Sequence, residues 1–279
     1  MRRHFWLLLL LMAGLLAGCQ DVRSPQVVKI GLIAPFEGPS RPLGYDVLYA
    51  VKLRIKQWNE SDARPKIELV ALNDDGDPAL AAILPKQLAQ DDGVRAILGP
   101  PQGHTAQAVA LGDGASSGIP TLLLAPIPGS APAALLPYAG TGPAYQQALA
   151  GVGDAAASWD APLSGPGIWL GAPLTLAELL VAEDEHLLAA GPVAEETAVR
   201  GWAGERVASL PWAAPEPQHL PADFAAAYHE LAGKAPTRAA ALAYAATDEA
   251  LRLIAAAPDY RPGVEALHTI TPPPIRIQP

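Results

Sequence analysis

Short apolar runs alternate with amphipathic stretches along the first half of the chain. Residues 27–34 form an apolar run rich in β-branched side chains, which predicts a buried strand. After a proline-rich loop, apolar residues recur at helical spacing from Leu43 to Trp58, and the charged residues fall on the other side. A strand, a loop and a returning helix make a βα unit. In open α/β sheets the ligand sits at the carboxyl ends of such strands.

Three further units of this kind follow the first. The expected strands are at residues 66–72, 94–98 and 120–124, and the expected helices at residues 79–90 and about 104–111. Asp77 is expected to cap the first of these helices, with Pro78 at its first position. Four βα units in succession predict an α/β fold with a parallel, doubly wound sheet.

The second half of the chain has a sparser pattern. The expected elements are helices at residues 144–157, 174–182, 224–232 and 237–256, and strands at residues 167–171, 187–190, 206–210 and 272–277. In the last two helices Phe224, Tyr228 and Leu251 fall at helical spacing with other apolar residues. This spacing predicts core packing rather than a cofactor site.

The opening stretch resembles a known family. From Ile30 the chain reads I-G-L-I-A-P-F-E-G-P, and the helix that follows ends near W-N. This pattern is similar to the start of the periplasmic leucine/isoleucine/valine-binding proteins, which are the solute-binding components of ABC importers. Near the end, F-x-x-x-Y, G-x-x-P and A-Y-x-A resemble the segment that returns into the family's first lobe.

The resemblance implies a two-lobed type I periplasmic-binding-protein fold with parallel, doubly wound sheets. The first lobe is expected at residues 27–132 plus about 213–265, and the second at about 133–212 plus 272–279. At roughly 30 residues per βαβ unit, the second lobe holds about two units where the family has three or four. A reduced second lobe is therefore expected.

Two loops would hold the ligand if the resemblance extends to the site. In the family motif G-P-x-x-S, the serine hydroxyl and the backbone N–H groups after it hold a carboxylate at a helix N-terminus. Gly103 stands at the serine position, Ile127 at a threonine position and Leu43 at an aromatic position. The scaffold is kept, but the usual polar groups are absent. The candidate ligand-binding residues are Leu43, Gln102, Gly103, His104, Thr105, Ala125, Ile127, Glu195 and Glu196.

Three of these candidates have a competing interpretation. His104 could contact the ligand or could be an exposed loop histidine, and the second interpretation is favoured. Glu195 and Glu196 lie near the point where the family's second lobe offers a glutamate to the ligand ammonium, but a solvated pair fits the sequence equally well.

Residues 1–19 are expected to be a lipoprotein signal peptide, and residues 20–26 a linker. A basic start precedes an apolar core, and Leu16-Ala17-Gly18-Cys19 resembles the bacterial lipobox. Cys19, the chain's single cysteine, is the expected lipidation site. A plain signal peptide is the less favoured alternative, and the apolar run is short for a transmembrane anchor.

Composition and motifs exclude several function classes. The net charge is −9 and no basic block suggests nucleic-acid binding. No nucleophile elbow, P-loop or HExxH motif is present, so we predict a protein that is not an enzyme and needs no cofactor. The acidic run 74–77 lacks the later ligands of a calcium loop, so no metal site is expected.

The sequence therefore predicts an extracytoplasmic, lipid-anchored protein that captures an amino acid or a related small polar solute. Its expected partners are the permease and ATPase of an ABC importer. The alternative is a divergent lipoprotein that uses the same fold to bind or regulate another protein of the cell envelope.

Overall fold

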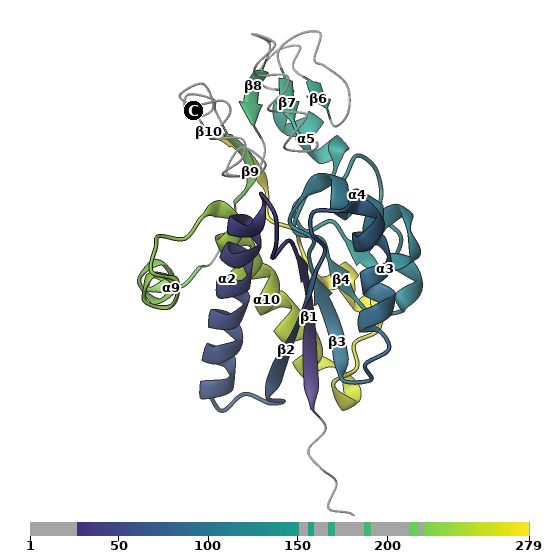
Figure 1. Ribbon diagram of the computed structural model, residues 1–279, viewed down its shortest axis with the longest axis vertical. Helices are drawn as coiled ribbons and strands as arrows, with labels where there is room; N and C mark the ends of the chain where they lie inside the picture. Colours follow the sequence, from purple (N-terminus) through teal and green to yellow (C-terminus); the bar gives the residue numbers. More distant parts are fainter. Residues whose placement is uncertain are drawn as a thin grey trace, which may run out of the picture.

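The computed structural model describes residues 27–150, 156–158, 167–170, 187–190, 212–216 and 220–278. Two five-stranded sheets are present among these residues, and they lie at opposite ends of the molecule (Figure 1). Within the described ranges, no helix is both long and apolar enough to cross a bilayer.

The first sheet has the strand order β2-β1-β3-β4-β5, and all of its strands are parallel. The strands are β1 (Val28–Ala34), β2 (Ile67–Asn73), β3 (Val94–Leu98), β4 (Thr121–Leu122) and β5 (Leu135–Leu136). The four predicted strands of this half are confirmed. β1 lies next to the middle of the sheet, and Ile30, Leu32 and Ile33 on it are fully buried.

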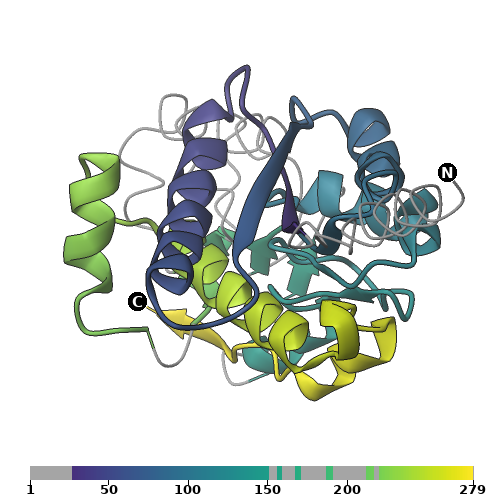
Figure 2. The ribbon, with the colours of Figure 1, turned by 90° about the horizontal axis from the view of Figure 1, so that it is seen from below.

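Helices cover both faces of this sheet, as a doubly wound fold requires (Figure 2). The helices of the first half are α2 (Arg41–Glu60), α3 (Pro78–Leu88), α4 (Gly103–Leu111) and the 3-10 helix η1 (Asp113–Ser117). Asp77 caps α3 as predicted, because its carboxylate accepts a hydrogen bond of 2.8 Å from Ala79 N. Leu84 and Leu88 of α3 pack against Ile97 of β3, whereas Val47 and Val51 of α2 belong to the larger core on the other face.

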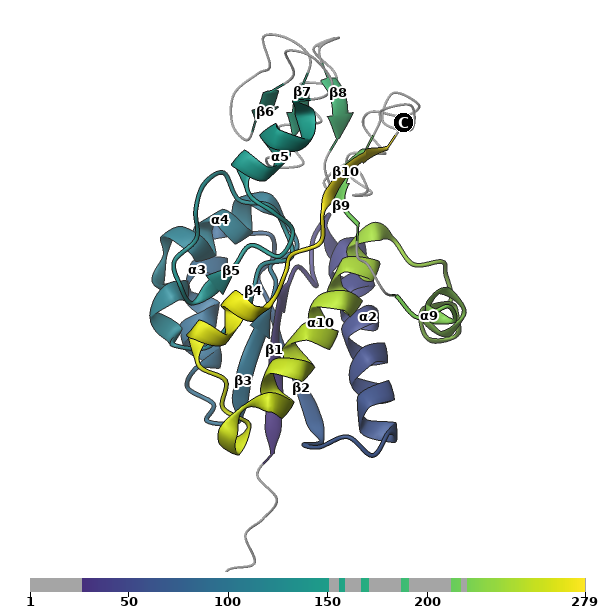
Figure 3. The same cartoon turned by 180° about the vertical axis from the view of Figure 1, so that it is seen from behind.

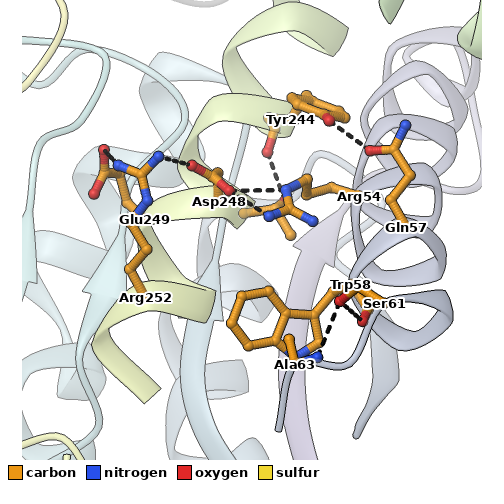
Figure 4. Close-up of polar contacts among 11 residues, drawn as sticks. Arg54, Gln57, Trp58, Ser61, Ala63, Tyr244, Asp248, Glu249 and Arg252 are labelled. Atoms are coloured by element: carbon orange, nitrogen blue, oxygen red, sulfur yellow. Dashed lines mark hydrogen bonds and ion pairs between the residues drawn. The ribbon is translucent and has the colours of Figure 1, made fainter. Parts of the chain in front are cut away.

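The carboxyl-terminal helices return to this first lobe. They are α9 (Phe224–Ala232) and α10 (Arg238–Ala256), followed by η3 (Pro258–Tyr260) and η4 (Val264–Thr269). α10 lies beside α2 (Figure 3), and Arg54 of α2 donates two hydrogen bonds, of 2.8 and 2.6 Å, to the Asp248 carboxylate (Figure 4). The prediction that these helices pack on the amino-terminal lobe is therefore confirmed.

The second sheet has the order β10-β9-β8-β7-β6. Its strands are β6 (Ala156–Ser158), β7 (Gly167–Trp169), β8 (Leu187–Ala190), β9 (Trp212–Pro215) and β10 (Ile275–Gln278). β6 to β9 are parallel, while β10 runs antiparallel to β9 at the edge. The strands predicted near 167–171, 187–190 and 272–277 are confirmed.

The helix predicted at residues 144–157 is wrong in its second half. α5 (Gly142–Leu149) ends early, and Ala156–Ser158 forms β6, which pairs with β7. The alanine-rich sequence hides this break, but Gly151 and Gly153 weaken helix propensity there and strand pairing takes over. The predicted helix at 174–182 and strand at 206–210 lie outside the described residues.

Two strands bear on the predicted lobe boundaries. β5 belongs to the first sheet although it follows residue 132, where the first crossover was expected. β9 belongs to the second sheet although it begins at Trp212 and covers residues assigned to the first lobe from about 213. The sheet that each strand joins is decided by its pairing with neighbouring strands. The expected boundaries were drawn from motifs, which carry no information on that pairing.

Candidate functional site

The two sheets approach each other at the carboxyl ends of β3 and β7. Gly103 begins α4 just after β3, and Leu170 directly follows β7. A Cβ atom at Gly103 would collide with the carbonyl oxygen of Leu170 and lie 3.5 Å from that of Pro126. Because ligands of this fold class bind at the carboxyl ends of parallel strands, this meeting point is the candidate site.

Gln102 and Ser40 join the starts of two helices at this edge. Gln102 occupies the N-cap position of α4, and Ser40 that of α2. The Gln102 side-chain amide donates a 2.8 Å hydrogen bond to the Ser40 hydroxyl, and the Gln102 side chain is almost completely buried. Gln102 therefore lies at the predicted site, where its side chain links the loop before α4 to the loop before α2.

Thr105 uses its hydroxyl inside the helix. The side chain is fully buried, and Oγ1 donates a 3.0 Å hydrogen bond to the carbonyl of Gln102. The hydroxyl thus stabilises the first turn of α4. This position does not replace the serine hydroxyl that is missing at Gly103.

His104 connects α4 to the loop after β2. Its Nε2 lies 3.0 Å from the carbonyl oxygen of Gly76, and since a carbonyl only accepts, Nε2 carries the proton and donates. Burial lowers the pKa of the imidazole, against the smaller opposing effect of this hydrogen bond, so the ring is neutral near pH 7. The favoured interpretation of an exposed loop histidine is therefore wrong, because His104 belongs to α4 and its ring is partly buried against the loop after β2.

Leu43, Ala125 and Ile127 are buried hydrophobic residues. They are exposed by only 6%, 1% and 2%, and Ala125 and Ile127 pack in a small cluster with Ala106 of α4. The Ile127 carbonyl also accepts a 2.8 Å hydrogen bond from Gly142 N at the start of α5. Ile127 thus supports the connection to the second lobe.

Asp74 is a group at this edge that the sequence analysis missed. It follows β2, is fully buried, and accepts a 3.0 Å hydrogen bond from Gly76 N at Oδ1, while Oδ2 finds no hydrogen-bond partner among the described residues. Burial raises its pKa to about 6. In the sequence it is only one member of the acidic run 74–77, and only the fold shows that it is buried.

The remaining predicted residues lie elsewhere. Glu195, Glu196 and Cys19 fall outside the described residues. Among those described, no three His, Cys, Asp or Glu side chains are close enough to hold a metal ion.

Three hollows on the described surface lie away from Gly103. One of about 450 Å³ is lined by Thr141, Gln147 and Pro273, between α5 and the approach to β10. One of about 300 Å³ lies between α2 and α10, and one of about 630 Å³ lies at the amino-terminal end of β1. None of them contains a candidate ligand-binding residue from the sequence analysis.

Comparison with known proteins supports the fold and the family resemblance that the sequence predicts. Residues 27–161 match a family model described as periplasmic binding protein. The chain has the fold of a type I periplasmic binding protein. The resemblance to the leucine/isoleucine/valine-binding family is confirmed, and a length of 279 residues fits the reduced second lobe that the sequence predicts.

Solved structures of type I periplasmic binding proteins cover most of the chain. The leucine-binding protein LivK from Thermotoga maritima superposes with a TM-score of 0.67 at 16% identity, over 87% of this chain and 86% of that one. LivJ from Streptococcus pneumoniae, in complex with isoleucine, gives a TM-score of 0.65 at 12% identity over 87% of both chains. A solute-binding protein of R. palustris, in complex with benzoate, gives 0.56 at 13% identity, over 87% of this chain and 84% of that one.

No curated protein sequence matches the chain. The three solved structures are described as binding proteins rather than as enzymes or envelope regulators. The comparisons therefore do not favour the alternative role in regulating another envelope protein.

Proposed function

We propose that this protein is a lipid-anchored, extracytoplasmic solute-binding component of an ABC importer. It would capture an amino acid or a related small polar solute between its lobes and deliver it to a permease that is driven by an ATPase. Binding by hinge closure needs two rigid lobes joined by flexible crossings. The meeting of β3 and β7 at their carboxyl ends, at Gly103 and Leu170, is the observation that carries this proposal.

The first turn of α4 is the feature that suits a polar solute. The first N–H groups of a helix have no intrahelical acceptor, and the helix dipole makes this end attractive to an anion. Isoleucine and benzoate, the ligands named for two of the similar structures, both carry a carboxylate. We infer that a small carboxylate is the first solute class to test.

A thermal-shift screen of the full-length protein in detergent tests the proposed solute role. The panel contains L-amino acids, aromatic carboxylates, amides and short peptides. One class is expected to raise the melting temperature in a concentration-dependent way, because a ligand that binds only the folded state stabilises it. No shift with any compound at millimolar concentration would contradict solute capture.

The anchor is tested separately by Cys19→Ser. If Cys19 carries the lipid, the variant is released to the soluble fraction or accumulates as an uncleaved precursor, whereas the wild type stays with the membrane. Fractionation followed by immunoblotting measures this. Processing and membrane association unchanged from the wild type would show that the lipobox interpretation is wrong.

A further inference from the structure

We infer that the carbonyl of Leu170 holds the second lobe against the first at the start of α4, which is the place where a carboxylate solute would bind. Gly103 is the residue that permits this contact, because a side chain there would meet the Leu170 carbonyl oxygen. This inference concerns the contact between the two lobes and does not depend on the proposed transport role.

The backbone at Gly103 does not itself require glycine. Its φ lies outside the left-handed region that favours glycine, and the residue stands in the first turn of α4. Glycine weakens a helix relative to alanine, so a glycine at this point needs another reason. Close approach of the second lobe supplies it, since the Leu170 carbonyl oxygen lies over the missing Cβ.

Burial shows that the contact excludes water on both sides. Leu170 is 2% exposed although it lies just beyond the carboxyl end of β7, and Gly103 is also buried. Gln102, whose amide is bonded to Ser40, is buried beside it. The edge of the first lobe is therefore already closed at the point where a solute would have to enter.

The charges at the start of α4 favour the contact with the Leu170 carbonyl. The same charges would attract a carboxylate solute, so the two would compete for this place. The start of α4 carries a partial positive charge, and a carbonyl oxygen is the negative end of the peptide dipole. A carboxylate would be attracted to the same place. If the proposed function is right, a carboxylate solute must first displace Leu170, and its apparent affinity falls by the fraction of molecules that are open.

Hydrogen–deuterium exchange of the full-length protein, without ligand, tests the contact. Gly103→Ala adds a single methyl group that cannot fit beside Leu170. Peptides covering residues 103–106 and 167–170 should exchange at least about fivefold faster than in the wild type, the smallest change that an overpacked contact should give. Gly129→Ala is the matched control, because no described atom lies within 4 Å of a Cβ built there. Exchange unchanged by Gly103→Ala would overturn the inference.

A second variant covers the case in which Gly103→Ala disturbs the first lobe itself. Peptides from β1 and β3 report this, since their exchange should stay slow if only the lobe contact opens. If they speed up, Leu170→Ala decides, because it removes a buried side chain and so loosens the packing that holds the Leu170 carbonyl in place, without adding a clash at Gly103. Faster exchange at residues 103–106 in Leu170→Ala supports the inference, and no change there overturns it.

Calorimetry with L-leucine tests the competition, which rests on the proposed function. Gly103→Ser displaces Leu170 and adds a hydroxyl, so it should bind L-leucine at least about tenfold more tightly than the wild type. Equal or weaker binding would overturn the competition. A protein that keeps the contact in exchange experiments but responds to no compound in the thermal screen would contradict the proposed function alone.

Discussion

Buried polar groups differ between two regions: the interface of α2 with α10, and the edge of the first sheet where α4 begins, which holds Asp74, Gln102, Gly103 and His104 and is called the cleft edge below. Between the helices, Asp248 is bonded to Arg54, and the Tyr244 hydroxyl donates a 2.5 Å hydrogen bond to the Gln57 side chain (Figure 4). At the cleft edge, Asp74 Oδ2 and His104 Nδ1 are buried, and neither meets a hydrogen-bond partner among the described residues.

The difference in hydrogen bonding distinguishes a region that stabilises the fold from a region suited to binding. Buried polar groups are normally paired, and those that are not often mark functional sites. The α2–α10 interface satisfies its side chains because it holds the fold together. The cleft edge keeps the helix starts of the binding-protein fold but has a glycine and hydrophobic residues where the family pattern carries hydroxyls. Four predictions test this contrast.

The largest effect is expected from removing the returning helices. Deletion from Pro221 onward uncovers the α2 face of the first sheet and takes away nearly half of its principal core, including Tyr228 and Leu251. Soluble expression should be lost, as judged by yield after centrifugation. Deleting only residues 275–279, which removes β10 at the edge of the second sheet, should leave the first lobe soluble. A well-folded protein ending at residue 220 would show that the first lobe does not need the α2–α10 interface to fold.

The cleft edge is expected to bind leucine, isoleucine or valine far more weakly than is typical of the named family. Each buried polar group left unpaired costs roughly 1–3 kcal/mol, and Gly103 and Ile127 offer no hydroxyl to a carboxylate. Two lost contacts weaken binding by about two to four decades. Calorimetry on the full-length protein measures it. Submicromolar binding of leucine would mean that the backbone of α4 suffices.

A core substitution measures the packing side of the comparison. Leu251→Ala on α10 empties a fully buried position and should lower the free energy of unfolding by about 2–5 kcal/mol. Leu231→Ala on α9 is the control, since this side chain is 40% exposed and should change stability little. Denaturant unfolding of both variants tests this, and equal losses would show that burial on α10 is not what stabilises the interface.

The smallest effect concerns the charge of Asp74. Its folded pKa of about 6 lies above the ordinary value of 3.8, so between these values the folded state binds more protons than the unfolded state. Stability should therefore fall as pH rises from about 4 to 6, by on the order of 2–3 kcal/mol for this group, and then level off. Asp74→Asn should flatten this dependence, whereas Asp75→Asn, at an exposed neighbour, should not. Denaturant unfolding across this pH range gives the comparison, and equal slopes in all three proteins would contradict a raised pKa.

Much of the first lobe could be predicted from the sequence. The apolar run at the start of β1, the cap at Asp77 and the helical spacing of Phe224 and Tyr228 are local patterns, so they fixed elements correctly. The prediction failed where alanine-rich sequence fits both helix and strand, as at Ala156–Ser158. The environment of the site could not be predicted, because whether Asp74 or His104 faces inward depends on loops that come from different strands.

By itself, the sequence determined the first four strands of the first sheet and the helices between them, the family pattern, and the absence of the usual hydroxyls at Gly103 and Ile127. Hydrophobic periodicity and motif spacing carry that information locally. Only the tertiary structure decided that α10 pairs with α2, that β5 and β9 belong to opposite sheets, and that Leu170 meets Gly103. These contacts join residues far apart in the chain, and their free energies arise from burial and close approach in three dimensions, which no local pattern records.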